Sequence, residues 1–181
     1  MADGLDVLAR LTSGAPIDAP TLVLVAHPDD ETIGLGARLN RFSDLVLVTA
    51  TNGAPLNMAD AERAGFTSST AYAQARKAEQ AAALGALAAR RREICFEIVD
   101  QACVDHVGDL ADRLVSVLAD RAVVITHPYE GGHPDHDACA MAVQLACAQL
   151  GDHAPLRLEF AAYHQAKGAM VSQAFLSLIH I

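Results

Sequence analysis

Residues Thr21–Glu31 read TLVLVAHPDDE, an apolar segment that continues directly into a cluster of polar and charged side chains. The first part, Thr21–Ala26, is short and rich in Leu and Val, which is typical of a strand buried on both faces of a parallel sheet. Further segments with a strand-like pattern are Asp44–Ala50, Ile94–Val99, Ala122–Thr126 and Leu156–Ala162. The sequence therefore predicts a sheet of five strands.

Helix-forming segments lie between these strands, at Ser69–Ala89, Asp105–Leu118 and Asp135–Leu150. This alternation predicts an α/β fold, a three-layer α/β/α sandwich with a mostly parallel, Rossmann-like sheet. We expect a single domain over residues 1–181, with its core at about 21–164 and a long loop at Asn52–Thr67. Because the apolar ending Leu176–Ile181 has neither a helix cap nor a polar end, we also expect the chain to be truncated at its C-terminus.

The composition excludes several classes of protein. Apolar residues make up 52% and charged residues 19% of the chain, so it has ample side-chain surface to bury and is not disordered. The net charge of −9 repels phosphate backbones and anionic lipids, and aromatic residues make up only 4%, so we expect no nucleic-acid partner. With no long apolar segment and an acidic N-terminus, we expect no membrane span and a cytoplasmic location.

The polar cluster after the first strand contains His27, Asp29, Asp30 and Glu31. Histidine and carboxylate side chains are good ligands for a divalent metal such as zinc. Adjacent carboxylates in an extended segment point to different sides, so one can bind a metal while its neighbour faces an open coordination position. Acidic residues also suit the first turn of a helix, and the pair alone is compatible with that simpler role.

A second polar cluster follows the fourth strand, where His127 is succeeded by His133-Pro134-Asp135-His136. Pro134 suits the first position of a helix, and His133 and His136 are spaced to lie on one helical face. Histidines at helix starts usually hold no ligand, but both clusters fall at the carboxyl ends of parallel strands, where such a sheet gathers distant residues. Three protein ligands and an open position are typical of catalytic zinc, although two histidines and a carboxylate also suit Fe²⁺.

Together, Ala26–Glu31 and Gly132–His136 closely resemble the motifs of the PIG-L/LmbE-like deacetylase family, with the similarity extending from about Thr21 to Tyr163. The resemblance implies a zinc-dependent N-deacetylase, in which Fe²⁺ or another divalent metal could replace zinc. Such a hydrolase removes an N-acetyl group from an N-acetylglucosamine-type sugar conjugate, so the expected partner is a small molecule.

The same resemblance implies roles for individual side chains. The implied metal ligands are His27, Asp30 and His136. Asp29 is the implied general base, and His133 would stabilise the oxyanion or protonate the leaving amine. The implied substrate contacts are Arg76 and Asp100, of which Asp100 would bind sugar hydroxyls. The chain departs from the family pattern at Gly131, where some members have a tyrosine.

Two other functions remain open. Gly34-Leu35-Gly36 faintly resembles a glycine-rich phosphate-binding turn, but the acidic loop before it would repel phosphate unless a metal intervened. A non-catalytic metal-binding protein with the same fold is the second alternative. Nucleotide binding, metal content and acetate release would separate these alternatives from the deacetylase.

Overall fold

A computed structural model describes residues 4–166, 169–172 and 174–175 of the chain. Five strands form a parallel sheet in the order β3-β2-β1-β4-β5. Their bounds are β1 Thr21–Val25, β2 Leu45–Pro55, β3 Arg92–Asp100, β4 Val123–Thr126 and β5 Leu156–Glu159. The prediction of a mostly parallel, five-stranded sheet is confirmed.

The order of the strands creates a switch point between β1 and β4. The chain proceeds from β1 to β2 and β3 on one side of the sheet, and then adds β4 and β5 on the other side of β1. Connections therefore diverge at the carboxyl ends of β1 and β4, which is where ligands bind in open α/β sheets.

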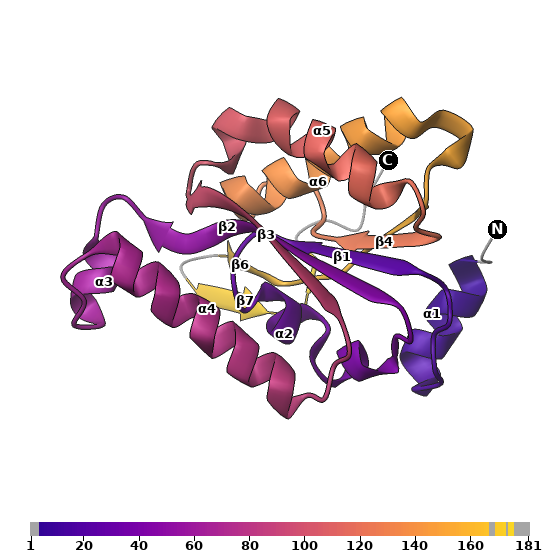
Figure 1. The fold of residues 1–181 in the computed structure, drawn as a ribbon, viewed down its shortest axis with the longest axis horizontal. Helices are drawn as coiled ribbons and strands as arrows, with labels where there is room; N and C mark the ends of the chain where they lie inside the picture. The colour runs from indigo at the N-terminus through magenta and orange to yellow at the C-terminus, as the bar shows by residue number, and fades with distance from the viewer. Residues whose placement is uncertain (1–3, 167–168, 173, 176–181) are drawn as a thin grey trace.

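Helices cover both faces of the sheet, as the three-layer prediction requires (Figure 1). One face carries α5 (Val107–Leu118) and α6 (Pro134–Leu150), and the other carries α4 (Ser69–Ala86) and the short α2 (Asp30–Gly34). The interface between the sheet and helices α5 and α6 is apolar. Its buried side chains include Leu22, Leu24 and Val124 from the strands and Leu110, Leu114, Leu118 and Val143 from the helices. A second buried cluster on the opposite face includes Val23, Val25, Leu47, Leu84 and Phe160.

Close packing explains the glycine at position 34, the last residue of α2. A Cβ atom at Gly34 would overlap the ring of Phe160, so the residue at this position must lack a side chain. Gly34 is thus accounted for by close packing of α2 against the segment after β5, and no phosphate is needed to explain it.

The region after β2 differs from the expected loop. Instead of ending before Asn52, β2 continues to Pro55, which pairs with Asp100 of β3, and the short α3 (Ala59–Arg63) follows. Pro55 is compatible with the end of a strand because a proline need only forgo one ladder hydrogen bond. The prediction of a long loop at Asn52–Thr67 is therefore partly wrong.

Several smaller elements were not predicted. They are α1 (Gly4–Ser13), the 3₁₀ turns η1 (Gly36–Arg41), η2 (Cys103–His106) and η3 (Gly151–His153), and the antiparallel hairpin of β6 (Tyr163–Ala166) and β7 (Ala169–Ser172). The expectation about Leu176–Ile181 concerns residues outside those described.

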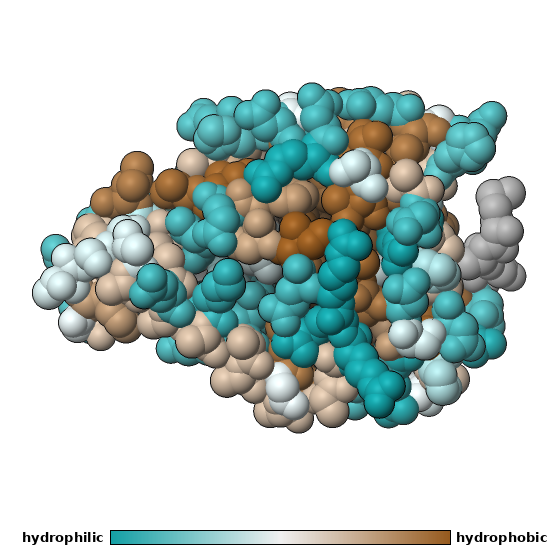
Figure 2. All heavy atoms as spheres, viewed as in Figure 1, coloured by the Kyte–Doolittle hydropathy of each residue, from teal (hydrophilic) through white to brown (hydrophobic). Residues whose placement is uncertain are grey.

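The molecular surface is mixed in character. Figure 2 shows hydrophilic side chains over much of the outer side of the α5 layer. Among the helices of the described residues, none has both the length and the apolar character needed to cross a membrane.

Candidate active site

Both polar clusters lie at the switch point between β1 and β4. His27 follows β1, and Asp30 is the first residue of α2. His133 is the N-cap of α6, and His136 lies in the first turn of that helix. The fold thus brings together side chains that are about 100 positions apart in the sequence.

Asp30 lies at the centre of the cluster and is completely buried. Its Oδ2 atom is 3.3 Å from Nδ1 of His27 and 3.4 Å from Nε2 of His136, and it also accepts a hydrogen bond from the His27 amide. Two tetrahedral zinc ligands at about 2.0–2.1 Å from the metal lie about 3.3–3.4 Å from each other. Each of these two distances, taken singly, is of the size expected between two ligands of one metal ion.

Unsatisfied polar atoms support the same fit. Asp30 Oδ1 and His136 Nε2 are buried, and neither has a hydrogen-bond partner among the described residues. Burial alone would raise the pKa of Asp30, but His127, His136 and His27 hold this pKa well below its usual value. A buried carboxylate that remains charged beside an unpartnered imidazole nitrogen is suited to binding a cation.

The second nitrogen of His27 contacts two carboxylates. Nε2 lies 3.1 Å from Oδ2 of Asp135 and 3.1 Å from Oδ1 of Asp100. Burial lowers the pKa of His27, but the hydrogen bonds with Asp100, Asp135 and Asp30 outweigh it and raise the pKa well above the ordinary value. The surroundings of this ring therefore favour a positive charge, which a proton or a metal ion can supply. A metal-ligating histidine commonly donates its other N–H to a carboxylate, as His27 can do here.

Among the residues that the structure describes, three overlapping groups of side chains have possible ligand atoms within 4.8 Å of one another. These groups are His27–His133–His136, Asp30–His127–His136 and His27–Asp100–Asp135. Each ligand that the sequence predicted belongs to at least one group, although the predicted set of three is not itself one of them. Asp135 and His127 were not predicted as site residues.

Asp29 has an unusual backbone conformation, with φ 135° and ψ −25°. Its carboxylate accepts a hydrogen bond of 2.9 Å from Arg76, whose Nη2 also donates to the carbonyl of Pro28 at 2.7 Å. Burial raises the pKa of Asp29, and Arg76 opposes this shift. Backbone strain of this kind is often found at functional sites, and here Arg76 helps to hold the strained residue in place.

A cavity of about 230 Å³ adjoins the cluster. Its lining residues are His27, Asp29, Gly53, Asp60, Tyr72, Arg76, Asp100, Gln101, His133 and Tyr163. The predicted base, the predicted oxyanion residue and both predicted substrate contacts therefore share one cavity wall. Gly53, with φ +68°, is required there because a Cβ atom would lie 2.7 Å from Cδ of Pro28.

His133 is oriented by the start of α6. Its Nδ1 accepts a hydrogen bond of 3.2 Å from the amide of Asp135, which places the proton of the neutral ring on Nε2. Burial, together with nearby His27 and His136, lowers the pKa of His133. The neutral ring is therefore a hydrogen-bond donor through Nε2.

Tyr163 is a further cavity residue that the sequence analysis missed. Its ring meets that of His136 edge to face, with centroids 5.3 Å apart. Burial raises the pKa of the phenol to about 12, so the hydroxyl keeps its proton and can donate a hydrogen bond. No sequence motif pointed to this residue, because it lies beyond β5 in an unpredicted hairpin.

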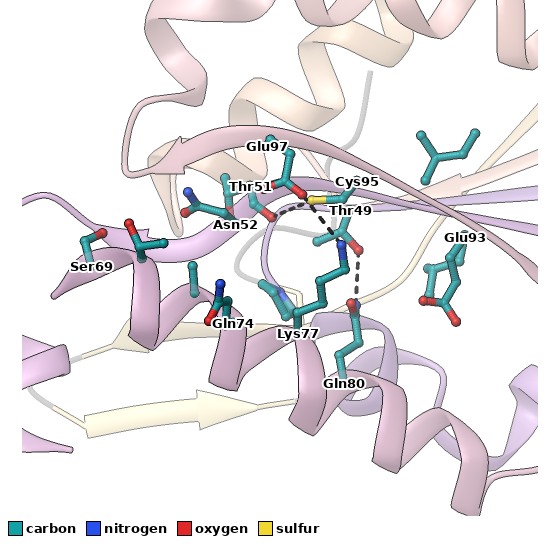
Figure 3. Close-up of a pocket in the computed structure, with 15 residues that line it drawn as sticks. Thr49, Thr51, Asn52, Ser69, Gln74, Lys77, Gln80, Glu93, Cys95 and Glu97 are labelled. Carbon is teal, nitrogen blue, oxygen red and sulfur yellow. Dashed lines mark hydrogen bonds and ion pairs between the residues drawn. The ribbon is translucent and has the colours of Figure 1, made fainter. Parts of the chain in front are cut away.

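A polar network links the site to helix α4. Gln80 donates hydrogen bonds of 3.1 Å to Oε2 of Glu31 and 3.1 Å to Oγ1 of Thr49. Glu31 is fully buried, and the same Oε2 accepts the amide of Asp29 at 3.3 Å. Gln80 and Thr49 also line a separate cavity of about 510 Å³ between α4 and strands β2 and β3 (Figure 3).

Comparisons with known proteins agree with this geometry. A family model described as PIG-L, GlcNAc-PI de-N-acetylase, matches residues 22–147. Among solved structures, the antimicrobial reagent A40926 pseudoaglycone deacetylase Dbv21 is 26% identical with a TM-score of 0.64, covering 80% of this chain and 64% of its own. A deacetylase triple mutant from the teicoplanin biosynthetic pathway is 27% identical with a TM-score of 0.60, covering 77% of this chain and 63% of its own.

The same fold also occurs in an enzyme of another class. GalB, the 4-carboxy-2-hydroxymuconate hydratase from Pseudomonas putida KT2440, is 23% identical with a TM-score of 0.55, covering 71% of this chain and 55% of its own. The chain spans less than two thirds of the length of these three structures. A comparison with curated proteins found no match. Because the family model includes both polar clusters and most of the sheet, the chain belongs to the PIG-L (GlcNAc-PI de-N-acetylase) family.

Proposed function

We propose that the chain is a metal-dependent hydrolase that removes the N-acetyl group from an N-acetylglucosamine-type sugar conjugate. The observation that carries this proposal is the buried carboxylate of Asp30, which lies between His27 and His136 while the adjacent Asp29 lines the cavity. In the proposal, His27, Asp30 and His136 hold the metal. When bound, zinc or another divalent ion polarises the acetyl carbonyl and lowers the pKa of the attacking water.

Asp29 is the proposed general base. Its carboxylate lies on the cavity wall and is 43% exposed, so a water molecule in the cavity can reach it. The hydrogen bond from Arg76 orients this carboxylate, and one oxygen remains available to accept a proton from water. In this account Arg76 supports the base and is also within reach of a substrate in the same cavity.

His133 is the proposed partner of the reacting carbonyl. Because its Nδ1 is occupied by the Asp135 amide, its Nε2–H can donate to the oxygen that becomes negatively charged. The leaving amine receives the proton that Asp29 accepted from water, so the neutral His133 keeps its Nε2–H throughout. Asp100 also lines this cavity and is the proposed acceptor for a sugar hydroxyl.

Substrate class is supported by the family description, which names N-acetylglucosamine, and by two relatives described as deacetylases. The test is acetate release from a panel that contains N-acetylglucosamine, its alkyl glycosides and N-acetylated disaccharides, with protein loaded separately with Zn²⁺ and Fe²⁺. Matched sugars without the acetyl group provide the blank. Acetate from at least one acetylated member supports the proposal, whereas metal-loaded protein that releases none contradicts it.

A further inference from the structure

The hydrogen bonds between β1 and β4 change from main-chain pairs to a side-chain contact next to the candidate site. Three residue pairs are in register, and the last is Val23 with Ile125. Beyond them, the amide of Ala26 donates to Nε2 of His127 at 3.1 Å, while the carbonyl of Thr126 accepts from the amide of Phe160 at 3.1 Å. A side chain thus replaces the main-chain acceptor at the point where the two strands separate.

The imidazole of His127 also packs flat against His136. The two ring centroids are 3.9 Å apart and the planes differ by 7°, while the Phe160 ring lies on His127 with centroids 4.9 Å apart. His127 is completely buried, so solvent cannot compete for these contacts. The stacked pair restricts the plane of a candidate metal ligand.

Retaining a histidine at this buried position has an energetic cost. Since Nε2 accepts the Ala26 amide, the neutral ring carries its proton on Nδ1, and Nδ1 is buried without a hydrogen-bond partner among the described residues. An unsatisfied buried donor is unfavourable, and a phenyl ring in the same space would avoid this cost. Compared with a phenyl ring, the imidazole differs by having a nitrogen that accepts a hydrogen bond.

We propose that His127 is a positioning residue of the metal site. Its Nε2 fixes the main chain of Ala26, and therefore the start of the loop that carries His27 and Asp30, while its ring fixes the plane of His136. Nε2 is 3.4 Å from Oδ2 of Asp30, so a displaced His127 would disturb every proposed ligand. The inference rests on the proposed metal site but not on the identity of the substrate.

Two variants separate the acceptor from the ring. His127→Phe keeps a stacking ring and removes the acceptor, whereas His127→Gln keeps an acceptor and removes the ring. Leu114→Ala is the control, because Leu114 is buried in α5 and its truncation destabilises the fold without altering a contact of His127. For each protein we would measure the Co²⁺ dissociation constant by competition with a chelating dye, together with the visible spectrum of bound Co²⁺.

We expect His127→Phe to weaken Co²⁺ binding by about 10–100-fold, the usual effect of losing a residue that orients a metal ligand. His127→Gln should lose less affinity than His127→Phe, with altered Co²⁺ bands, because it restores the acceptor but not the stack. Leu114→Ala should lower the unfolding midpoint and leave both the affinity and the spectrum unchanged.

Wild-type affinity and spectra in both His127 variants would show that the residue only fills space and would overturn the proposal. A larger loss in His127→Gln than in His127→Phe would also overturn it, because the acceptor would then not be decisive. If His127→Phe does not fold, His127→Gln decides alone: weaker Co²⁺ binding with altered bands supports the proposal, and an unchanged constant refutes it. Wild-type protein that binds no Co²⁺ overturns this proposal together with the metal site, whereas binding without acetate release defeats the proposed function alone.

Discussion

The α5–α6 layer and the α4 layer cover the same sheet with different chemistry. Under α5 and α6, buried leucines such as Leu110 and Leu114 pack in one apolar cluster with Leu24 of β1. On the α4 side, beside β2 and β3, Thr49 and Gln80 instead line a cavity of about 510 Å³ with other polar side chains (Figure 3). Within α4, buried packing is supplied by Leu84, near the end of the helix.

This difference assigns separate tasks to the two layers. Apolar burial contributes stability that does not depend on any single polar contact. The α4 layer has less of this apolar burial. Its polar residues Gln80 and Arg76 instead form hydrogen bonds with the loop that carries Asp29. We therefore expect changes among the apolar side chains under α5 and α6 to alter stability, and changes at the α4 side or at the switch point, where α6 begins, to alter activity.

The largest effect is expected at Asp30, which lies at the switch point of the sheet. Asp30→Ala removes the carboxylate between His27 and His136 and should lower metal affinity by more than the roughly 10–100-fold caused by losing an outer partner. Metal content per chain and acetate release should fall together. Asp109→Ala, at an exposed position of α5, is the matched control; an Asp30→Ala protein that retains its metal would contradict the assignment.

Asp29→Asn should separate activity from metal binding. The amide keeps the shape of the side chain but cannot accept the proton, so acetate release should fall by about 10²–10⁴-fold while metal content stays at the wild-type level. Both quantities are measured on one preparation whose fold is checked by circular dichroism. Loss of the metal in this variant would show that Asp29 is a ligand and that the two aspartates have been assigned the wrong roles.

Leu114→Ala tests the apolar layer. Leu114 is fully buried, and truncating such a side chain usually lowers the free energy of unfolding by about 2–5 kcal/mol. Urea unfolding followed by circular dichroism gives this value. Metal-loaded enzyme assayed well below its unfolding midpoint should keep its wild-type turnover; a parallel loss of turnover would remove the distinction between the layers.

Gln80→Leu is the smallest of these changes. It removes one hydrogen bond from buried Glu31, which should cost about 1–3 kcal/mol of stability, and it loosens the anchor of the Asp29 amide. We expect a modest fall in kcat with little change in metal content. Gln74→Leu is the control, because Gln74 lies on the same helix and lines the same cavity without a hydrogen bond to Glu31 (Figure 3); equal effects of the two substitutions would exclude the proposed link.

The sheet was predictable because its strands have a local signature. Segments such as Thr21–Ala26 and Ala122–Thr126 are short and apolar, and the structure places β1 and β4 there. The extension of β2 to Pro55 was not predictable, since it depends on pairing with a distant strand rather than on local preference. Likewise, the prediction that β5 continues to Ala162 was wrong, because the strand ends at Glu159.

The polar clusters were also visible in the sequence, but their supporting contacts were not. Asp135 and His27 are 108 positions apart, and His127 and Ala26 are 101 positions apart. Contacts over such separations arise from the order of the strands, which a single sequence does not specify residue by residue. The roles of Asp30 and Asp29 are predictions that the variants above address, and the roles of Arg76 and Asp100 also remain predictions.

Acetate release before and after metal removal shows most directly whether hydrolysis by this chain depends on a metal ion. The chain is stripped with a chelator, dialysed and assayed on the acetylated sugar that gives the highest rate, and Zn²⁺ is then restored in equimolar amount. We expect no acetate above the blank for the stripped protein, recovery with Zn²⁺, and no recovery in Asp30→Ala. Equal release before and after stripping, or full recovery in Asp30→Ala, would contradict this expectation.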